Sequence, residues 1–265
     1  MLAGPGSGKT KTITIKIARL LAEDVVAPRR IACITYSNAC VAELRKRLRT
    51  LKVEDEKRLS LSSVHSFCLT ELVLPYGRIA GLSLPDPLNV ATPSQALAAF
   101  KDSEIAVLGS EQRPWFRTQC ERLRRTILDR ESREWSNWTR RQTAVVEAYE
   151  TELLARSLID FDGMVLAGVR LIEEFPWVRQ VIKAKYPVIV VDEYQDLGLP
   201  LHRMMLALMQ EANVRVIAVG DPDQSIYGFT GANPALFNAL ASLPRVKKIR
   251  LKLNYRCAEN IITAS

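Results

Sequence analysis

Seven residues near the start of the chain have the composition of a phosphate-binding loop. Its glycines let backbone N–H groups wrap around phosphate oxygens at the positive end of a following helix. Lys9 is placed to reach the β and γ phosphates, and the Thr10 hydroxyl to bind Mg²⁺, although Ala3 replaces the usual first glycine. The alternative interpretation is a glycine-rich connector. We expect nucleotide contacts from Gly4, Pro5, Gly6, Ser7, Gly8, Lys9 and Thr10.

A second candidate group is a pair of carboxylates directly after the apolar run Val188 to Val191. Such a β-branched run predicts a buried strand of a parallel sheet, and ligands bind at the carboxyl ends of these strands. Asp192 is placed to hold Mg²⁺, and Glu193 to orient or deprotonate an attacking water. Because carboxylates also cap helices, a structural cap is the alternative. Together with the loop, the pair predicts hydrolysis of a nucleotide phosphoanhydride.

Six motifs, in order along the chain, resemble those of UvrD/Rep-type superfamily-one DNA helicases. They are Ile34-Thr35-Tyr36-Ser37-Asn38-Ala39, Val64-His65-Ser66-Phe67, Asp160-Phe161-Asp162, Asp192-Glu193-Tyr194-Gln195-Asp196, Gly220 to Phe229, and Leu253-Asn254-Tyr255-Arg256. The resemblance implies a P-loop, RecA-like parallel sheet flanked by helices, in a motor that moves along DNA with 3′ to 5′ polarity. It implies ATP and Mg²⁺ as cofactors. The implied partners are single-stranded DNA and duplex junctions, bound without sequence specificity.

The resemblance also implies roles for individual residues. Gln224 would contact the γ-phosphate, Tyr255 would stack on adenine, and Arg256 would stabilise charge on the transferred phosphoryl group. Aromatic rings stack on any base, which suits a motor that steps along arbitrary sequence. Burial in the core is the alternative for the aromatic residues, and a structural hydrogen bond is the alternative for His65. The implied DNA contacts are Tyr36, Asn38, His65, Phe67, Tyr227 and Phe229.

Two features depart from the family pattern. Many relatives have arginine at the position of Gly228 and tryptophan at that of Phe229, so we expect a weaker DNA contact there. Only Met1 and Leu2 precede Ala3, so most of the strand leading into the phosphate loop, and the family's adenine-reading glutamine, are expected to be missing. The resemblance also implies a second motor domain, and this chain is therefore interpreted as the front half of a motor.

Short apolar runs and helix-period patterns alternate outside the middle of the chain. Strands are expected around residues 31–35, 188–191 and 214–219, with further strands nearer the sheet edge around 59–61 and 249–253. The apolar faces at 13–21 and 41–51 predict one helix after the glycine loop and another after the strand at 31–35. Helical patterns without a convincing strand fill residues 92–175. We expect an α/β motor domain of residues 1–91 and 176–265, with residues 92–175 as an inserted all-helical subdomain.

Within this insertion, Trp115 and Trp138 lie beside arginines, a combination that could bind nucleic acid. We favour packing of these tryptophans in a small helical bundle beneath a charged surface. Asp160 and Asp162 are interpreted as N-terminal caps of the helix that follows them.

The composition is that of a globular protein, with 265 residues of which 48% are hydrophobic and 25% are charged. No apolar run is long enough to cross a bilayer and no signal sequence precedes the loop, so a cytoplasmic protein without a membrane partner is expected. The formal charge of +8 favours a polyanionic partner. The five cysteines form no CxxC pair, which argues against a zinc site or a disulfide framework.

These patterns predict the ATP-binding portion of an ATP-dependent DNA helicase or translocase. Two alternatives stay open at this point. One is the helicase half of a helicase–nuclease, and the other is a nucleotide-dependent module that binds DNA or a protein without hydrolysis. The sequence indicates neither the pathway nor any protein partner.

Overall fold

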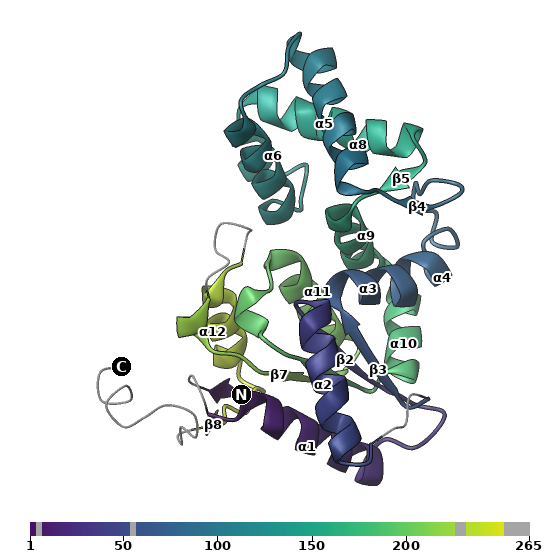
Figure 1. Cartoon of the computed structure of the whole chain (residues 1–265), viewed down its shortest axis with the longest axis vertical. Helices are drawn as coiled ribbons and strands as arrows, with labels where there is room; N and C mark the ends of the chain where they lie inside the picture. The colour runs from purple at the N-terminus through teal and green to yellow at the C-terminus, as the bar shows by residue number, and fades with distance from the viewer. Residues whose placement is uncertain (4–6, 54–56, 226–231, 252–265) are drawn as a thin grey trace. The chain divides into compact units, whose positions relative to one another are not determined.

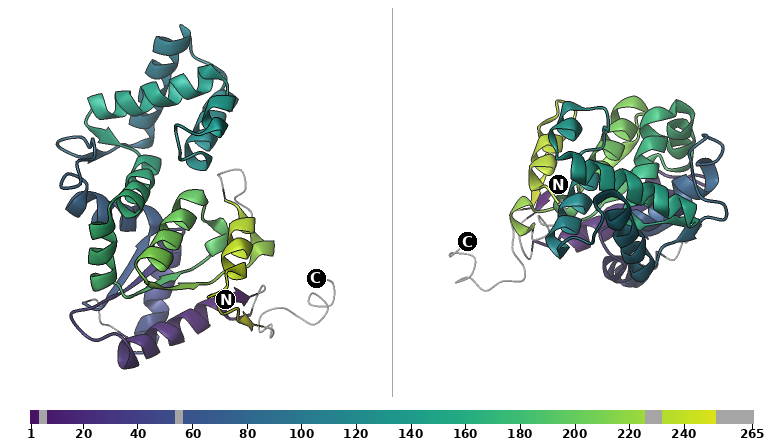
Figure 2. Two further views of the ribbon diagram at one scale, coloured as in Figure 1. Left: turned by 180° about the vertical axis from the view of Figure 1, so that it is seen from behind. Right: turned by 90° about the horizontal axis from the view of Figure 1, so that it is seen from above.

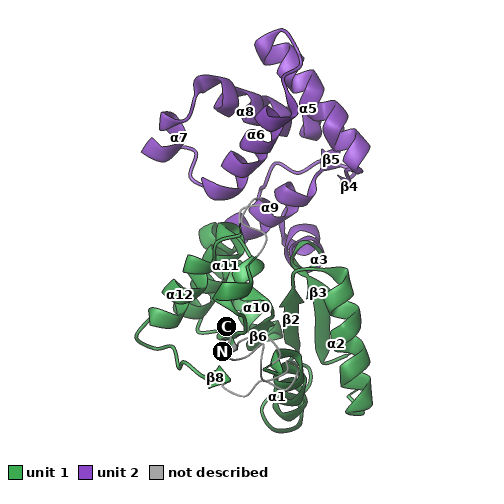
Figure 3. Cartoon of the chain, turned by 60° about the vertical axis from the view of Figure 1, so that its left-hand side comes forward, with its two compact units in different colours: residues 1–67, 172–265 green, residues 68–171 purple. Residues whose placement is uncertain are grey.

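The computed structural model describes residues 1–3, 7–53, 57–225 and 232–251. The chain forms two compact units (Figure 3). The first unit contains Met1–Phe67 and Ile172–Ser265, and the second contains Cys68–Leu171.

A four-stranded parallel sheet forms the centre of the first unit. Ile31 pairs with Val188 across the two middle strands, and Val188 pairs with Arg215 on the next strand. Every residue of the two middle strands is buried, which explains their unbroken apolar runs. The strands lie in the order β3 (Leu59–Ser63), β2 (Ile31–Thr35), β6 (Val188–Val191) and β7 (Arg215–Ala218).

A short parallel pair lies beside this sheet. In it, β1 (Leu2–Ala3) pairs with β8 (Arg250–Leu251). Leu2 also forms a parallel bridge with Gly220, and the Met1 ammonium donates a hydrogen bond to the carbonyl of Ala218. The strand that leads into the glycine loop therefore runs next to the chain that follows β7.

Helices cover both faces of the sheet in the first unit (Figures 1 and 2). On one face, α1 (Lys9–Glu23) and α2 (Asn38–Thr50) pack against alternate strand residues, including Cys33 and Val190. The two predicted helices and the strands at 31–35 and 188–191 are confirmed at these places. The other helices of this unit are α3 (Val64–Phe67), α10 (Pro176–Lys185), α11 (Leu199–Glu211), α12 (Pro234–Ser242) and the 3₁₀ helices η2 (Tyr194–Asp196) and η3 (Pro222–Gln224).

The second unit is mainly helical and has its own apolar core, to which Phe100, Leu123 and Val145 contribute. Its longest helices begin at clear capping residues, since the Thr92 side chain forms a capping box with Gln95 at the start of α5. The helical segments are η1 (Cys68–Val73, a π-helix), α4 (Leu74–Tyr76), α5 (Pro93–Leu108), α6 (Pro114–Thr126), α7 (Arg133–Asn137), α8 (Arg140–Ala155) and α9 (Phe161–Glu174), whose last residues belong to the first unit.

The second unit starts at Cys68, earlier than the expected insertion at residue 92. Two contacts account for this difference. A Cβ atom built on Gly168 of α9 would lie 3.0 Å from the Cys68 sulfur, so η1 packs closely against α9. Furthermore, β4 (Asn89–Val90) pairs with β5 (Leu158–Ile159). The expectation that residues 92–175 contain no strand was therefore wrong.

The packing prediction for the tryptophans holds only in part. Trp138 is half-buried and packs against the core, but the Trp115 side chain is 57% exposed and does not. Asp160 caps α9 as predicted, because it accepts a hydrogen bond of 2.7 Å from the Gly163 N–H. Asp162 lies within the first turn of α9 and binds the Arg125 guanidinium at 2.8 Å, so it is not the N-terminal cap that was predicted.

Two further expectations concern membranes and cysteines. No helix in the described part of the chain combines the length and apolar character needed to cross a bilayer. Cys33, Cys40, Cys68 and Cys120 are free thiols, and Cys257 lies outside the described residues.

Candidate active site

The described part of the glycine loop ends in a left-handed turn at Gly8. This residue has φ of +81°, a conformation that glycine adopts at little cost, and α1 begins at the next residue. The Gly8 carbonyl accepts the Thr12 N–H, which joins the turn to the first helical turn. Lys9 and Thr10 thus stand at a helix N-terminus, where free N–H groups and the helix dipole favour phosphate. Gly4, Pro5 and Gly6 lie outside the described residues.

The two predicted carboxylates follow β6 directly. Asp192 donates its backbone N–H to Ile34 on β2 and accepts the Glu193 N–H at its own carboxylate, at 3.0 Å. Glu193 has φ of +49°, a left-handed conformation that costs a non-glycine residue about 1–3 kcal/mol and is common at functional sites. The Glu193 side chain does not cap the 3₁₀ helix η2 that follows it. The alternative of a structural cap is therefore not supported for Glu193.

Two predicted residues from distant parts of the chain, Glu193 and Gln224, meet at the ammonium group of a third, Lys9. Lys9 Nζ lies 3.7 Å from Glu193 Oε2 and 3.2 Å from Gln224 Oε1. The Lys9 side chain is 10% exposed and that of Glu193 is 30% exposed, so the lysine is largely enclosed while the glutamate remains accessible to a ligand. The start of α1, the end of β6 and the loop after β7 therefore converge on one place.

Gln195 belongs to this site but was not assigned a role from the sequence. It is only 1% exposed, and its Nε2 donates a hydrogen bond to Glu193 Oε2 at 2.8 Å. Its Oε1 accepts the Asp221 N–H at 2.9 Å, and Asp221 in turn accepts a short hydrogen bond from the Gln224 amide. The motif of five residues beginning at Asp192 contains this glutamine, so its presence was visible in the sequence while its contacts were not.

Two carboxyl groups of this site, buried Asp192 and half-buried Asp196, have perturbed acidities. Burial, together with the nearby charge of Glu193, raises the pKa of Asp192 to about 6. The Glu193 N–H and the Lys9 ammonium act in the opposite direction. Burial and the Glu193 charge likewise raise the pKa of Asp196 to about 6. The site therefore concentrates negative charge in a poorly solvated place, which favours the binding of a cation.

The donor groups of this site are hard oxygen ligands, the kind that Mg²⁺ prefers. Among the residues that the structure describes, no group of three or more His, Cys, Asp and Glu side chains could enclose a metal ion. Mg²⁺ does not need such a group, because it usually binds one or two carboxylates, several waters and the phosphates of its substrate. The electron-rich Asp192 carboxylate is a hard oxygen ligand of this kind, and Thr10 would supply a hydroxyl. These residues fit Mg²⁺ bound together with a nucleotide.

The predicted DNA contacts in the described region follow β2 and β3. Tyr36 is half-buried and comes directly after the carboxyl end of β2, and Asn38 is exposed and is the first residue of α2. His65 is half-buried in α3, which follows β3. Because the strands are parallel, these residues share the sheet edge with Asp192.

Phe67 does not fit the predicted DNA contact. Its side chain has no exposed surface and packs against Tyr186, with ring centroids 6.1 Å apart. A fully buried ring offers no face to a base, so this structure supports the alternative of a core residue. Tyr227, Phe229, Tyr255 and Arg256 lie outside the described residues.

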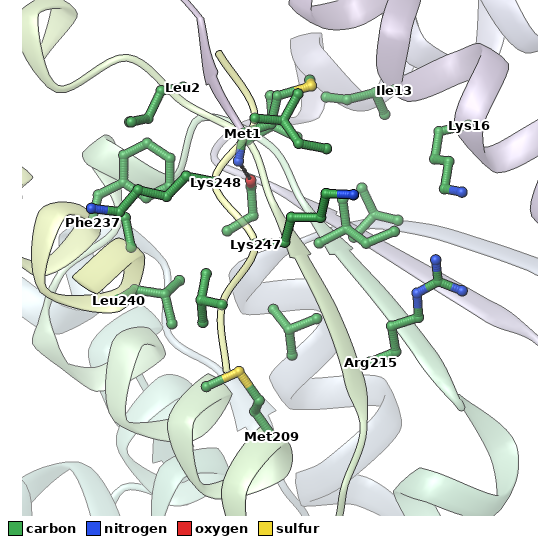
Figure 4. A pocket seen from close by; sticks show the side chains of 18 of the residues that line it. Met1, Leu2, Ile13, Lys16, Met209, Arg215, Phe237, Leu240, Lys247 and Lys248 are labelled. Atoms are coloured by element: carbon green, nitrogen blue, oxygen red, sulfur yellow. Dashed lines mark hydrogen bonds between the residues drawn. The ribbon is translucent and has the colours of Figure 1, made fainter. Parts of the chain in front are cut away.

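A cavity of about 640 Å³ lies elsewhere in the first unit, between β7 and residues 245–251 (Figure 4). Apolar side chains such as Val216 and Leu240 line it, and Lys16, Lys247 and Arg215 also border it. Its lining contains none of the predicted catalytic or nucleotide-binding residues. The candidate active site is therefore the place where α1, β6 and the loop after β7 meet, and not this cavity.

The parallel sheet, the helix that begins in a glycine turn and the carboxylates after β6 define an α/β domain of the RecA-like, P-loop class. The sequence model of the UvrD/REP helicase N-terminal domain matches residues 1–244. The chain belongs to this family, which confirms the fold class and the family resemblance expected from the motifs.

Curated relatives of this chain are helicases from staphylococci. The chain is 30% identical over 278 residues to the ATP-dependent DNA helicase PcrA of Staphylococcus epidermidis. It is 28% identical over 273 residues to the protein of the same name from Staphylococcus aureus. Each comparison covers the whole of this chain and 37% of the relative's length, so the chain spans little more than a third of these proteins.

Proposed function

We propose that this chain is the ATP-binding motor domain of an ATP-dependent DNA helicase or translocase. The observation that carries the proposal is that Glu193 and Gln224 both lie beside the Lys9 ammonium. A phosphate-binding lysine, a candidate base and a polar amide are the groups that phosphoryl transfer to water requires at one place. The names of the similar PcrA proteins support ATP and DNA as the ligands.

Each side chain has a defined task in this proposal. Lys9 holds the β and γ phosphates, Glu193 orients and deprotonates the attacking water, and Gln224 senses the γ-phosphate. Thr10 and Asp192 hold Mg²⁺, which when bound neutralises charge on the phosphate oxygens. Two residues outside the described region complete the site, with Tyr255 stacking on adenine and Arg256 stabilising the transferred phosphoryl group.

The proposed DNA surface lies at the same sheet edge as the nucleotide site. Tyr36, Asn38 and His65 follow the carboxyl ends of β2 and β3, as Asp192 follows that of β6. With Tyr227 and Phe229 they would contact single-stranded DNA and duplex junctions without sequence specificity. A formal charge of +8 supports a polyanionic partner. By resemblance to the family, movement would have 3′ to 5′ polarity.

The test is phosphate release by the natural protein that contains these residues, measured with and without single-stranded DNA. We expect DNA to accelerate ATP hydrolysis, and strand displacement to require a 3′ tail and not a 5′ tail. ATP binding without hydrolysis under both conditions would instead identify a non-hydrolysing binding module.

A further inference from the structure

We propose that Gln195 is a positioning residue that holds the Glu193 carboxylate in place and ties it to the loop after β7. This inference rests on the function proposed above. The Gln195 amide is almost fully buried and uses both of its polar atoms within the site. It therefore acts on the reaction through Glu193 and not by touching the nucleotide.

The contacts form a closed ring of five residues, in which Asp221 takes part through both its backbone N–H and its carboxylate. Lys9 lies 3.7 Å from Glu193, Glu193 accepts the Gln195 amide at 2.8 Å, and Gln195 accepts the Asp221 N–H at 2.9 Å. Asp221 accepts the Gln224 amide, and Gln224 Oε1 lies 3.2 Å from the Lys9 ammonium. Since the ring passes through the three regions that form the site, movement of one member is transmitted to the others.

A glutamine side chain is specifically suited to the position of Gln195. Its Nε2 donates to the carboxylate of Glu193 and also lies 3.5 Å from Asp196 Oδ2, whereas its Oε1 accepts from the backbone of Asp221. A carboxylate would lose the donor and a hydrocarbon chain would lose both polar functions. Removing either function would leave a poorly solvated group without its hydrogen bond.

Gly220 makes this arrangement possible. A Cβ atom at this position would lie 2.4 Å from Gln195 Oε1, a separation at which one of the two groups must move. The same atom would lie 3.2 Å from the Tyr194 backbone nitrogen, whose N–H donates a hydrogen bond to the Val219 carbonyl. The absence of a side chain at Gly220 thus allows the Gln195 amide to reach the backbone after β7.

The ring explains why Glu193 needs a second partner. When a γ-phosphate attracts the Lys9 ammonium, Glu193 loses its nearest positive charge. The hydrogen bond from Gln195 then continues to fix the direction of the carboxylate. Without Gln195, the carboxylate is free to follow Lys9, and the base is no longer aimed at the water. The chemical step should therefore suffer more than nucleotide binding.

The test compares Gln195→Met with Gln142→Met in the natural protein, using DNA-stimulated ATP hydrolysis. Gln142 is a matched control, because it is also a buried and hydrogen-bonded glutamine but lies in the second unit. We expect Gln195→Met to lower kcat about 10- to 100-fold, the scale of a misplaced catalytic group, with little change in the KM for ATP. The Gln142→Met variant should keep the kcat of the wild type.

Two further variants separate positioning from a general loss of structure. Gln195→Glu keeps the size and the acceptor oxygen but removes the donor to Glu193, and it should also lower kcat. Gly220→Ala should do the same by displacing the Gln195 amide, and Gly220→Ala combined with Gln195→Ala should be no worse than Gln195→Ala alone. Thermal melting shows which variants are folded.

The outcomes are distinguishable. Folded Gln195→Met and Gln195→Glu variants with the kcat of the wild type would overturn the role of Gln195 and leave the proposed function intact. A general fall in both kcat and nucleotide affinity, shared by Gln142→Met, would also overturn it. A wild-type protein that binds ATP but does not hydrolyse it would overturn the proposed function, and with it the positioning of a base by Gln195.

Discussion

The ammonium of Lys9 lies 3.2 Å from the side-chain oxygen of Gln224, although 215 positions separate the two residues in the sequence. Lys9 is also 3.7 Å from Glu193, so its charge is held by an amide dipole and a carboxylate. A phosphate that enters the site competes with both groups for the lysine. On the proposed function, binding of the nucleotide would therefore be coupled directly to the candidate base and to the loop after β7.

Replacing Lys9 with alanine should abolish the binding of Mg²⁺-ATP. The Lys9 side chain is 10% exposed and stands at the N-terminus of α1, where a phosphate is favoured by free N–H groups and the helix dipole. Isothermal titration of the purified proteins measures the effect. Lys11→Ala, at an exposed position of the same helix, is the matched control and should bind as the wild type does. Equal affinities for Lys9→Ala and wild type would refute the assignment.

Glu193→Gln should separate nucleotide binding from hydrolysis. The substitution keeps the size of the side chain and an acceptor for Gln195, but it removes the carboxylate that would accept a proton from water. In the natural protein we expect the hydrolysis rate to fall by about a hundredfold or more, the scale of a positioned general base. Single-turnover phosphate release measures this rate, with the exposed Glu43→Gln as the control. Normal hydrolysis by Glu193→Gln would remove Glu193 from its proposed role.

Tyr36 and Phe67 should respond differently to replacement by alanine. Phe67 is fully buried against Tyr186, so its loss should lower the free energy of unfolding by about 3–5 kcal/mol. Tyr36 is half-buried at the proposed DNA surface, and its loss should weaken DNA binding by about 1–3 kcal/mol if one base stacks there. Denaturant titration and fluorescence anisotropy with unrelated oligonucleotides distinguish the two effects. Weaker binding by folded Phe67→Ala, with normal binding by Tyr36→Ala, would contradict this assignment.

The parts of the fold that could be predicted from the sequence are those with a continuous local pattern. The expected strand at 31–35 agrees with β2 at both ends, and that at 188–191 agrees with β6, because each is an unbroken apolar run buried on both faces. The strands β4 and β5 have only two residues each, too few for any alternation to be visible. Trp115 and Phe116 are adjacent on α6, so both cannot face the same core, and Phe116 is the one that is buried.

The candidate site was predictable in its residue types but not in its connections. Lys9, Asp192 and Glu193 stand in local motifs whose chemistry follows from spacing. The contact between Gln195 and the backbone of Asp221 spans 26 positions and depends on how two loops pack at the ends of β6 and β7. No local pattern encodes that packing. The burial of Phe67 was likewise hidden, since a short motif does not show which way a ring points.

A buried ion-pair network lies in the second unit. Arg124 on α6 is 5% exposed and binds Glu150 at 2.7 Å and Asp160 at 2.5 Å. Asp160 also accepts hydrogen bonds from the Tyr149 hydroxyl at 3.0 Å and from the Gly163 N–H at 2.7 Å. Asp160 therefore joins α6, α8 and the start of α9. Replacing Asp160 removes one of the carboxylates that bind the buried Arg124 guanidinium.

Asp160→Asn should lower the free energy of unfolding at pH 7 by about 3–5 kcal/mol, the usual cost of removing one partner of a buried pair. The matched control is Asp162→Asn, which breaks a more exposed pair with Arg125 and should cost at most about 1 kcal/mol. Chemical denaturation followed by circular dichroism measures both changes. A smaller cost for Asp160→Asn than for Asp162→Asn would contradict the central role of Asp160.

The pH dependence of the stability difference between wild type and Asp160→Asn tests whether Asp160 stabilises the fold through its charge. Burial by itself would raise the pKa of Asp160, but the Arg124 guanidinium and the hydrogen bonds from Gly163 and Tyr149 outweigh it and lower the pKa below its ordinary value of 3.8. A group whose pKa is lowered in the folded state stabilises the fold above its unfolded-state pKa, and this contribution is lost as the pH falls through the folded-state value. The stability gap between wild type and Asp160→Asn should therefore be constant from pH 7 to about pH 5 and should narrow below about pH 4. A gap that is unchanged at pH 3, in protein that is still folded, would show that Asp160 acts by shape and hydrogen bonding and not by its charge.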